Sequence, residues 1–504
     1  GSWSEWVEVW VGRCSTGRGR VEVLRRKFRA RLLGGRDAGD TVVLDGSTVN
    51  HKPCAAAIAA LPGRQARREV VRRLVYVDPD PDPDDRSAQT ERKIPGMFRT
   101  IIGAAIEIPG NEPVRDELER LDEMNRRIRT LRKVIDLARP EVNRHVDAII
   151  AAGQPDLAPD LETVAEWRQQ ANALAAEGAG FAFESYFQLK LLRVLERLET
   201  VFVDLAARFG VEGQEESIRS TLATWAEHYL GPQTGQDANA DRLVAIAFLR
   251  GFDVDFRVRR IRFVIRRLNE LYRHGGTLAD AIRSTELDDI KKALYGELDM
   301  IKRRWDADYF APDVARAAAG LSGSDAGSRI EQLIHAMEFE MDLVGADSEI
   351  DAIFQFHDKQ HIGQNARREL LSAYVGFGFF DVLSYPMVQW GDIDEMEEIR
   401  IHRLSPEDAR DIRPGGHPVT LKGAELRHFG AFFNRTYREH DYLWGRLTTA
   451  DRLVDIVADS APEAAHLIDI ATVKHRLFEA ILQAEVPFLK ADAALIPSLR
   501  DVLT

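Results

Sequence analysis

The feature that most constrains the fold is a helical spacing of apolar residues, which runs from Asn111 almost to the end of the 504-residue chain. Apolar side chains three or four positions apart lie on one face of a helix, so these stretches predict a mainly α-helical fold. Four such stripes are Val114, Leu118, Leu121, Ile128, Leu131 and Ile135; Phe187, Leu191, Val194, Leu198, Val201 and Leu205; Ile290, Leu294, Leu298, Ile301 and Trp305; and Ile330, Leu333, Met337 and Met341. We expect Asn111 to cap the first helix and Gly210 to end the second. Two more helices are expected over residues 426–457 and 473–482.

The first 90 residues show a different pattern. Residues 41–44 (TVVL) form a short β-branched run, residues 53–61 are typical of a helix, and residues 70–77 form a second apolar run. Strand, helix and strand in this order indicate a βαβ unit with parallel strands. One such unit cannot bury both faces of a sheet, so these residues should belong to a larger sheet, whose remaining strands are not visible downstream.

An acidic and proline-rich run, DPDPDPDD, comes after the second strand and predicts a linker. We therefore divide the chain into a small α/β remnant over residues 1–90 and a large helical domain over residues 91–504. A short β element near residues 397–403 (EIRIHR) interrupts the helices, and Ser405 is placed to cap a helix after it. In this arrangement the strand at residues 70–77 has no neighbouring strand, which leaves an edge that invites pairing and proteolysis.

The composition limits the partners and the compartment. The chain has 81 acidic and 68 basic residues, a net charge of −13, which argues against nucleic acid as a partner. Cys14 and Cys54 are its only cysteines, so a disulfide framework is excluded and a reducing, cytoplasmic compartment is expected. The longest apolar stretches, such as residues 373–380, are shorter than the ~20 residues that span a bilayer.

The sharpest local pattern is VVLDGSTVNHKP, over residues 42–53. A carboxylate at the carboxyl end of a parallel strand, followed by glycine, lies where open α/β sheets bind their ligands. Asp45-Gly46 is also a favoured turn pair. From spacing alone, a catalytic site and a simple turn both remain open.

The same segment resembles a known family. LDGSTVNHKP, followed by RRLVYVDPDP, resembles the Asp-Gly segment of patatin-like acyl hydrolases. Three later stretches resemble long bacterial members, including their C-terminal helical domain of unknown function: KIPGMFRTIIGAAIEIPGNEPVRDELERLDEMNRR, GDIDEMEEIRIHRLSPEDA and LRHFGAFFNRTYREHDYLWGRLTTADRL. The resemblance implies a serine hydrolase with a Ser-Asp dyad on a three-layer α/β fold, which cleaves acyl esters of lipids without a metal or an organic cofactor. Asp45 would be the dyad aspartate and Gly46 would allow close approach, whereas Ser47 stands where the family usually has Gly or Ala.

The family's nucleophile elbow, G-x-S-x-G, and its Gly-rich loop lie before the Asp-Gly segment, and this sequence has no such pattern. Without a nucleophile and oxyanion donors, Asp45 has nothing to activate. We therefore expect the C-terminal part of a patatin-like protein, inactive alone, with a lipid or acyl ester as substrate and an upstream patatin half as partner. The alternative is a non-catalytic helical module with a regulatory or membrane-proximal role.

Other polar residues favour structural roles. Cys54 begins an alanine-rich segment and is typical of a small buried thiol, and His51 is typical of a loop histidine. His357 and His361 would point the same way on a helix, but no third metal ligand stands at a recognisable spacing. A further group is expected to form a solvated helix face: His428, Glu439, His440 and Asp441.

Residues 252–272 mix apolar residues with arginines. A basic amphipathic helix can lie on an anionic membrane surface, which would suit a protein that is peripheral to the membrane. Because apolar residues occur on more than one face, we favour a packed helix whose arginines pair with neighbouring acidic helices. The arginines are Arg257, Arg259, Arg260, Arg262, Arg266 and Arg267.

Overall fold

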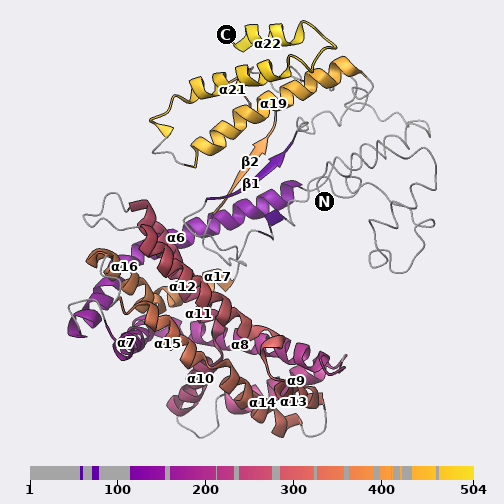
Figure 1. The fold of residues 1–504 in the computed structure, drawn as a ribbon. Coiled ribbons are helices and arrows are strands. Elements are labelled where there is room, and N and C mark those ends of the chain that lie inside the picture. The colour runs from indigo at the N-terminus through magenta and orange to yellow at the C-terminus, as the bar shows by residue number, and fades with distance from the viewer. Residues whose placement is uncertain are drawn as a thin grey trace, which may run out of the picture. The chain divides into compact units, whose positions relative to one another are not determined.

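The computed structural model describes residues 57–58, 60, 71–78, 114–153, 159–211, 213–231, 238–274, 284–322, 326–356, 362–389, 398–409, 411–412, 421–422, 434–460 and 465–503. Helices dominate these residues and two short strands accompany them, so the expected mainly α-helical fold is confirmed (Figure 1). Internal contacts divide the chain into one unit of residues 1–56 and 82–117 and a second unit of residues 57–81 and 118–504. The second unit contains the strands and almost all of the described helices.

The helices of its main apolar core run in chain order from α6 to α17. Their bounds are α6 (Val114–Gly153), α7 (Leu161–Ala179), α8 (Phe181–Ala207), α9 (Glu215–Tyr229), α10 (Ala238–Phe252), α11 (Val254–His274), α12 (Ser284–Lys302), α13 (Pro312–Ala319), α14 (Ala326–Met341), α15 (Leu343–Ile353), α16 (Gln364–Val375) and α17 (Phe377–Gln389), with short 3-10 turns η3 (Arg303–Trp305), η4 (Ala307–Tyr309) and η5 (Gly320–Ser322).

The four predicted apolar stripes lie on helices α6, α8, α12 and α14, and their central residues are buried. Each stripe faces the same apolar cluster, which explains why the helical spacing is so regular. Gly210 has a φ of +74° just after the end of α8, so the predicted helix stop is confirmed. Trp305 lies in the turn η3 rather than on α12, and Asn111 is outside the described residues.

The junction of α16 and α17 requires glycine at position 376. A Cβ atom on Gly376 would lie 2.6 Å from the Ser372 carbonyl oxygen and 2.9 Å from methyl groups of Val142 and Val146. The missing side chain therefore lets α6 pass close to this junction. Taken together, these two helices, bent by 53°, pass a length-and-composition test for a membrane span, whereas no single helix among the described residues does.

The two strands form a parallel pair, β1 (Arg72–Val77) and β2 (Ile399–Leu404), whose register matches Arg72 with Ile399 and Val77 with Leu404. Both strands were predicted within two residues. The expectation that residues 70–77 lack a neighbouring strand is wrong, because the partner arrives from far downstream in the sequence, after the helical block (Figure 1). That distance explains the error, since no local pattern links the two strands.

Helices cover both faces of this strand pair. On one face, Leu74 and Ile399 pack against Leu121 of α6. On the other, Arg73 and Arg400 each bind Asp459, at 2.7 and 2.6 Å, next to the end of α19 (Arg435–Ala458). Parallel strands are stable when both faces are covered, so the pair forms a small α/β/α layer arrangement.

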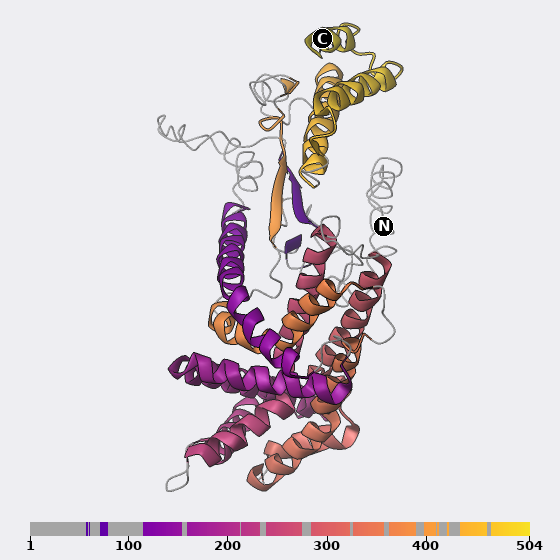
Figure 2. The same cartoon turned by 90° about the vertical axis from the view of Figure 1, so that its left-hand side faces the viewer.

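Helix α6 contributes to both the strand pair and the helical core. The Asn125 side chain donates a hydrogen bond to the Ile399 carbonyl at 2.8 Å and accepts one from the Ile399 N–H at 3.0 Å. The second half of the helix, from Leu131 onward, lies in the main apolar core. Pro140 stands inside the helix, where it removes a backbone hydrogen bond, and Figure 2 shows the helix changing direction along its length.

The C-terminal helices form their own core. α19, α21 (Ile470–Glu485) and α22 (Leu495–Leu503) enclose Leu443, Leu447 and Phe478, which confirms the two predicted helices of the tail. The helix predicted to begin at Ser405 is not found at residues 406–408, which form a turn. Ser405 is fully buried and its Oγ accepts the Glu407 N–H at 3.4 Å, so its capping bond closes a turn instead.

Candidate functional site

Most residues singled out in the sequence lie outside the described part of the structure, so the roles expected of them remain predictions. They are Asp45, Gly46, Ser47, His51, Cys54, His357, His361 and His428.

The described carboxyl ends of β1 and β2 carry a small polar group. Asp78 is buried and its N–H donates to the Leu404 carbonyl at 3.0 Å, which extends the strand pairing by one bond. Arg403 donates two hydrogen bonds to the Asp408 carboxylate, at 2.7 and 2.9 Å. Because open α/β sheets bind ligands at this edge, these residues mark the side of the sheet where a site would lie.

The helix face expected to be solvated is mostly covered. The side chains of Glu439 and His440 are 11% and 13% exposed. Glu439 accepts the Ala491 N–H at 2.8 Å, Asp441 accepts the Lys422 N–H at 2.8 Å, and His440 contacts Asp441 at 3.0 Å. The expectation was wrong because these polar groups bind backbone N–H groups of loops that pack on α19.

The arginine-rich helix α11 lies within the helical core, and its first half pairs with buried carboxylates. Arg257 donates to Asp347 of α15 at 2.7 and 3.1 Å, and Arg260 donates to the same carboxylate at 2.5 Å. Arg259 forms a two-bond pair with Asp381 of α17, at 2.7 and 3.0 Å. The packed-helix interpretation of these arginines is confirmed.

A lysine extends this network on α8. The Lys190 Nζ lies 2.6 Å from Asp253 and 3.9 Å from Asp381. The Tyr186 hydroxyl donates to Asp381 at 2.8 Å. Burial first, and then the adjacent Asp381 carboxylate, raise the pKa of Tyr186. Lys190 and Arg259 thus face two carboxylates, so the charges balance and the group forms a buried polar part of the core.

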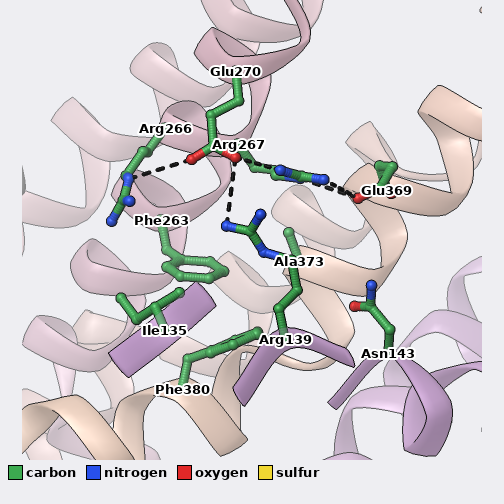
Figure 3. Close-up of a pocket in the computed structure, with 10 residues that line it drawn as sticks. All are labelled: Ile135, Arg139, Asn143, Phe263, Arg266, Arg267, Glu270, Glu369, Ala373 and Phe380. Atoms are coloured by element: carbon green, nitrogen blue, oxygen red, sulfur yellow. Dashed lines mark hydrogen bonds and ion pairs between the residues drawn. The ribbon is translucent and has the colours of Figure 1, made fainter. Parts of the chain in front are cut away.

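A pocket opens beside the second half of α11, between α6, α16 and α17 (Figure 3). Its volume of about 20 Å³ has room for one or two water molecules. One side is apolar and the other is rich in charge. The lining residues are Ile135, Arg139, Asn143, Phe263, Arg266, Arg267, Glu270, Glu369, Ala373 and Phe380.

Glu270 is the centre of the charged side, and three guanidinium groups converge on its carboxylate (Figure 3). Arg267 donates a hydrogen bond to it and also reaches Glu369 of α16. The Arg139 and Arg266 guanidinium groups lie farther away, at 3.5 and 3.6 Å. Burial alone would raise the pKa of Glu270, but Arg139 and Arg267 hold that pKa below its ordinary value.

The two arginines of the pocket differ in their electrostatics. Burial lowers the pKa of Arg266 to about 10, and the positive charges of Arg132 and Arg139 add to the effect. For Arg267, the hydrogen bond and charge of Glu369 outweigh burial, so its pKa is raised. A buried arginine whose neighbours do not restore its ordinary pKa is a common mark of a functional position.

The sequence contained only part of the signal for this pocket. Arg266 and Glu270 stand four residues apart on one helix, as do Arg132 and Asp136, and such spacings predict local ion pairs. Nothing in the sequence indicates that α6 and α11 face each other across Phe263. The convergence of their arginines was therefore missed.

Other hollows and polar clusters are less suited to a ligand. A hollow of about 300 Å³ is lined in part by Arg126 and Arg127 of α6, but these side chains are exposed and pair with Asp122 and Glu123 one turn away. Within the described ranges, no three His, Cys, Asp or Glu side chains lie close enough together to hold a metal ion. The pocket beside Glu270 is thus the best-formed candidate for ligand binding.

Comparison with known proteins agrees with the C-terminal part of the sequence analysis. Residues 312–503 match a family described as a protein of unknown function, DUF3376. A stretch of 39 residues is 49% identical to a protein of Mycobacterium tuberculosis named as an uncharacterized membrane protein. That stretch covers 8% of this chain and only 4% of the relative. No solved structure matches the chain.

Proposed function

We propose that this chain is part of a patatin-like lipid acyl hydrolase, in which Asp45 is the aspartate of a Ser-Asp dyad. Its nucleophilic serine and oxyanion donors would come from an upstream segment. The substrate would be an acyl ester of a lipid, met by a cytoplasmic protein at the membrane surface. No metal or organic cofactor is needed for this chemistry.

The observation that best supports the proposal is the parallel strand pair. β1 follows the Asp-Gly segment in sequence, and both faces of the pair are covered, by α6 on one side and by residues at the end of α19 on the other. This layering is what the resemblance to patatin-like proteins implies. Domains of the matched family also commonly follow patatin domains. The segment that resembles patatin-like proteins and the family match thus support the same proposal.

The proposed mechanism uses one proton transfer and two acyl transfers. Asp45 accepts the proton of the serine hydroxyl while the serine oxygen attacks the ester carbonyl carbon. The alcohol leaves with a proton and the acyl group remains on the serine. Water then attacks this acyl-serine, with Asp45 again accepting a proton, and releases the fatty acid. Gly46 leaves room for the carboxylate to approach the serine.

The test is hydrolysis of a short-chain p-nitrophenyl ester by the complete protein and its Asp45→Ala variant. We expect turnover to fall by about three orders of magnitude or more, since removal of one member of a catalytic unit costs roughly that much. Asp37→Ala, a nearby carboxylate outside the Asp-Gly segment, is the matched control and should retain activity. Unchanged turnover in Asp45→Ala would refute the proposal.

A second experiment compares the 504-residue chain alone with the chain mixed with its separately expressed upstream segment. Activity only in the mixture supports a dyad divided between the two parts. Activity of the chain alone would mean that the nucleophile lies within it.

A non-catalytic helical module is the second candidate function. The match to a family of unknown function, over residues 312–503, lies entirely outside the Asp-Gly segment and favours this candidate. Absence of esterase activity from the mixture, with the two parts shown to associate, would establish it over the hydrolase. Its expected role is regulatory or membrane-proximal.

A further inference from the structure

We propose that the pocket beside Glu270 binds a phosphate-type oxyanion, held by Arg139 of α6 and Arg266 of α11. This site goes beyond the proposed hydrolase and holds whether or not the chain takes part in ester hydrolysis. The shared ligand chemistry is a phosphate group, which can come from inorganic phosphate or from the headgroup of an anionic phospholipid.

The geometry brings the donors of two helices together around one carboxylate. The Arg139 and Arg266 guanidinium groups approach the Glu270 carboxylate to 3.5 and 3.6 Å, which exceeds a normal hydrogen bond. The contact of each with Glu270 is therefore an attraction between charges, and neither geometry is fixed by a close bond to that carboxylate. A planar guanidinium group matches two oxygens of a phosphate, so a small rotation of either side chain allows two-bond recognition.

The charge around the pocket also favours an anion. Four arginines face three carboxylates, which leaves one positive charge in excess: Arg132, Arg139, Arg266 and Arg267 against Asp136, Glu270 and Glu369. Arg132 additionally contacts Glu398 at 3.1 Å, but Glu398 is shared with Arg129 at 3.0 Å, so the excess is unchanged. A bound oxyanion would neutralise this excess charge.

The shape of the pocket limits the ligand. Ile135, Phe263 and Phe380 form an apolar wall that offers no hydrogen bonds to competing water. The volume of about 20 Å³ is too small for an acyl chain, so a lipid would present only its headgroup, with its chains outside. Binding displaces one or two waters and seats the phosphate at the guanidinium side.

The buried cation is costly for the fold, and this cost argues for a role. A methionine at position 266 would keep the apolar stem of the side chain and remove a charge that burial and two neighbouring arginines disfavour. Positions where stability is sacrificed are concentrated at functional sites. A purely structural arginine at this place would instead be expected to stabilise the protein.

The test uses the 504-residue chain and inorganic phosphate as the probe. Calorimetry and thermal unfolding are followed as phosphate is added at constant ionic strength, with chloride as the reference anion. We expect phosphate to bind and to raise the unfolding temperature. Arg266→Met and Arg139→Met should each weaken binding at least tenfold, whereas Arg266→Lys, which keeps the charge, should retain part of it.

Arg316→Met is the matched control, because Arg316 is exposed on α13 and pairs only locally with Asp313. It should bind phosphate as the parent chain does. Cosedimentation with phosphatidylglycerol vesicles, and with phosphatidylcholine vesicles for comparison, then identifies the source of the phosphate. Binding to phosphatidylglycerol that free phosphate competes away indicates a headgroup, and binding of free phosphate alone indicates a soluble anion.

Two results would overturn the site. One is the absence of phosphate binding by the parent chain. The other is equal binding by the parent chain, Arg266→Met and Arg139→Met, since that would place the anion elsewhere. Neither result depends on ester hydrolysis, so failure of the anion site and failure of the hydrolase are distinguishable.

Discussion

The two halves of helix α11 use the same residue type in opposite ways. In the first half, Arg259 and its neighbours meet Asp381 and Asp347 in close ion pairs. The carboxylates outweigh the effect of burial, so the pKa of Arg259 is raised and that of Asp347 is lowered. In the second half, Arg266 is similarly buried, yet its pKa is lowered to about 10.

The difference shows that burial of an arginine does not reveal its role. An arginine with its own close carboxylate contributes to the fold, whereas one surrounded by other arginines costs free energy unless a ligand adds negative charge. The pairing partners come from different helices, α15 and α17 for the first half and α6 and α16 for the second. The helix itself is uniform, and its surroundings separate structure from binding.

The largest expected effect is on the first half. Asp381→Ala removes the carboxylate that binds Arg259 and accepts the Tyr186 hydroxyl, and it leaves the arginine buried without compensation. Breaking one partner of a buried pair costs about 3–5 kcal/mol of unfolding free energy. Urea unfolding of the variant and the parent chain measures it. A loss below about 1 kcal/mol would mean that the first half is no more dependent on its pairs than the surface is.

The next prediction reverses the sign within the same helix. Arg266→Met should stabilise the chain by about 1–3 kcal/mol, because a lowered pKa of this size corresponds to a penalty of roughly 3 kcal/mol for the charged form. Arg259→Met, the matched substitution, should destabilise it, because it strands Asp381 in the core. Thermal unfolding of both variants in chloride buffer is the measurement. Destabilisation by both would erase the difference between the two halves.

The elements of the fold were largely predictable, whereas their long-range partners were not. Local spacing identified α8, α12 and α14 and the two strands, because each has a regular apolar pattern of its own. The β1–β2 pairing joins Arg72 to Ile399 across the entire helical block, and no short-range signal encodes it. The turn after Ser405 resembles a helix start in sequence because a capping serine serves both structures.

The candidate site was less accessible from the sequence than the fold. The pairing of α11 arginines with acidic helices was expected in kind, but Asp347, Asp381 and Glu369 could not be identified as their partners. The pocket depends on the contact of α6 with α11, which only packing reveals. Asp45 and Gly46 were identified by resemblance and remain predictions.

A smaller effect arises from pH and tests the second half alone. The pKa of Arg266 in the folded chain, about 10, lies below its ordinary value of 12.5. As pH rises through 10, the folded chain loses this proton before the unfolded chain does, so the penalty in the parent chain diminishes and its stability rises relative to Arg266→Met.

The advantage of Arg266→Met should therefore narrow by about 1 kcal/mol between pH 8 and 10.7. The charged groups that face Arg266 carry the same charge across this range: Arg132, Asp136 and Arg139 on α6, Arg267 and Glu270 on α11, and Glu369 on α16. Titrations elsewhere are common to both proteins and cancel. Parallel urea unfolding curves at several pH values measure the difference, and a constant gap would contradict the lowered pKa.

The smallest expected effect comes from an ion pair of equal length at the surface. Arg316 and Asp313 lie 2.5 Å apart, as do Arg260 and Asp347, but their side chains are 66% and 88% exposed. Water and dissolved salt screen the surface pair, so Asp313→Ala should change the unfolding free energy by no more than about 0.5 kcal/mol. Asp347→Ala, by contrast, should cost several times more, since two arginines lose their carboxylate. Equal losses in the two variants would show that contact distance, rather than burial, sets the strength of these pairs.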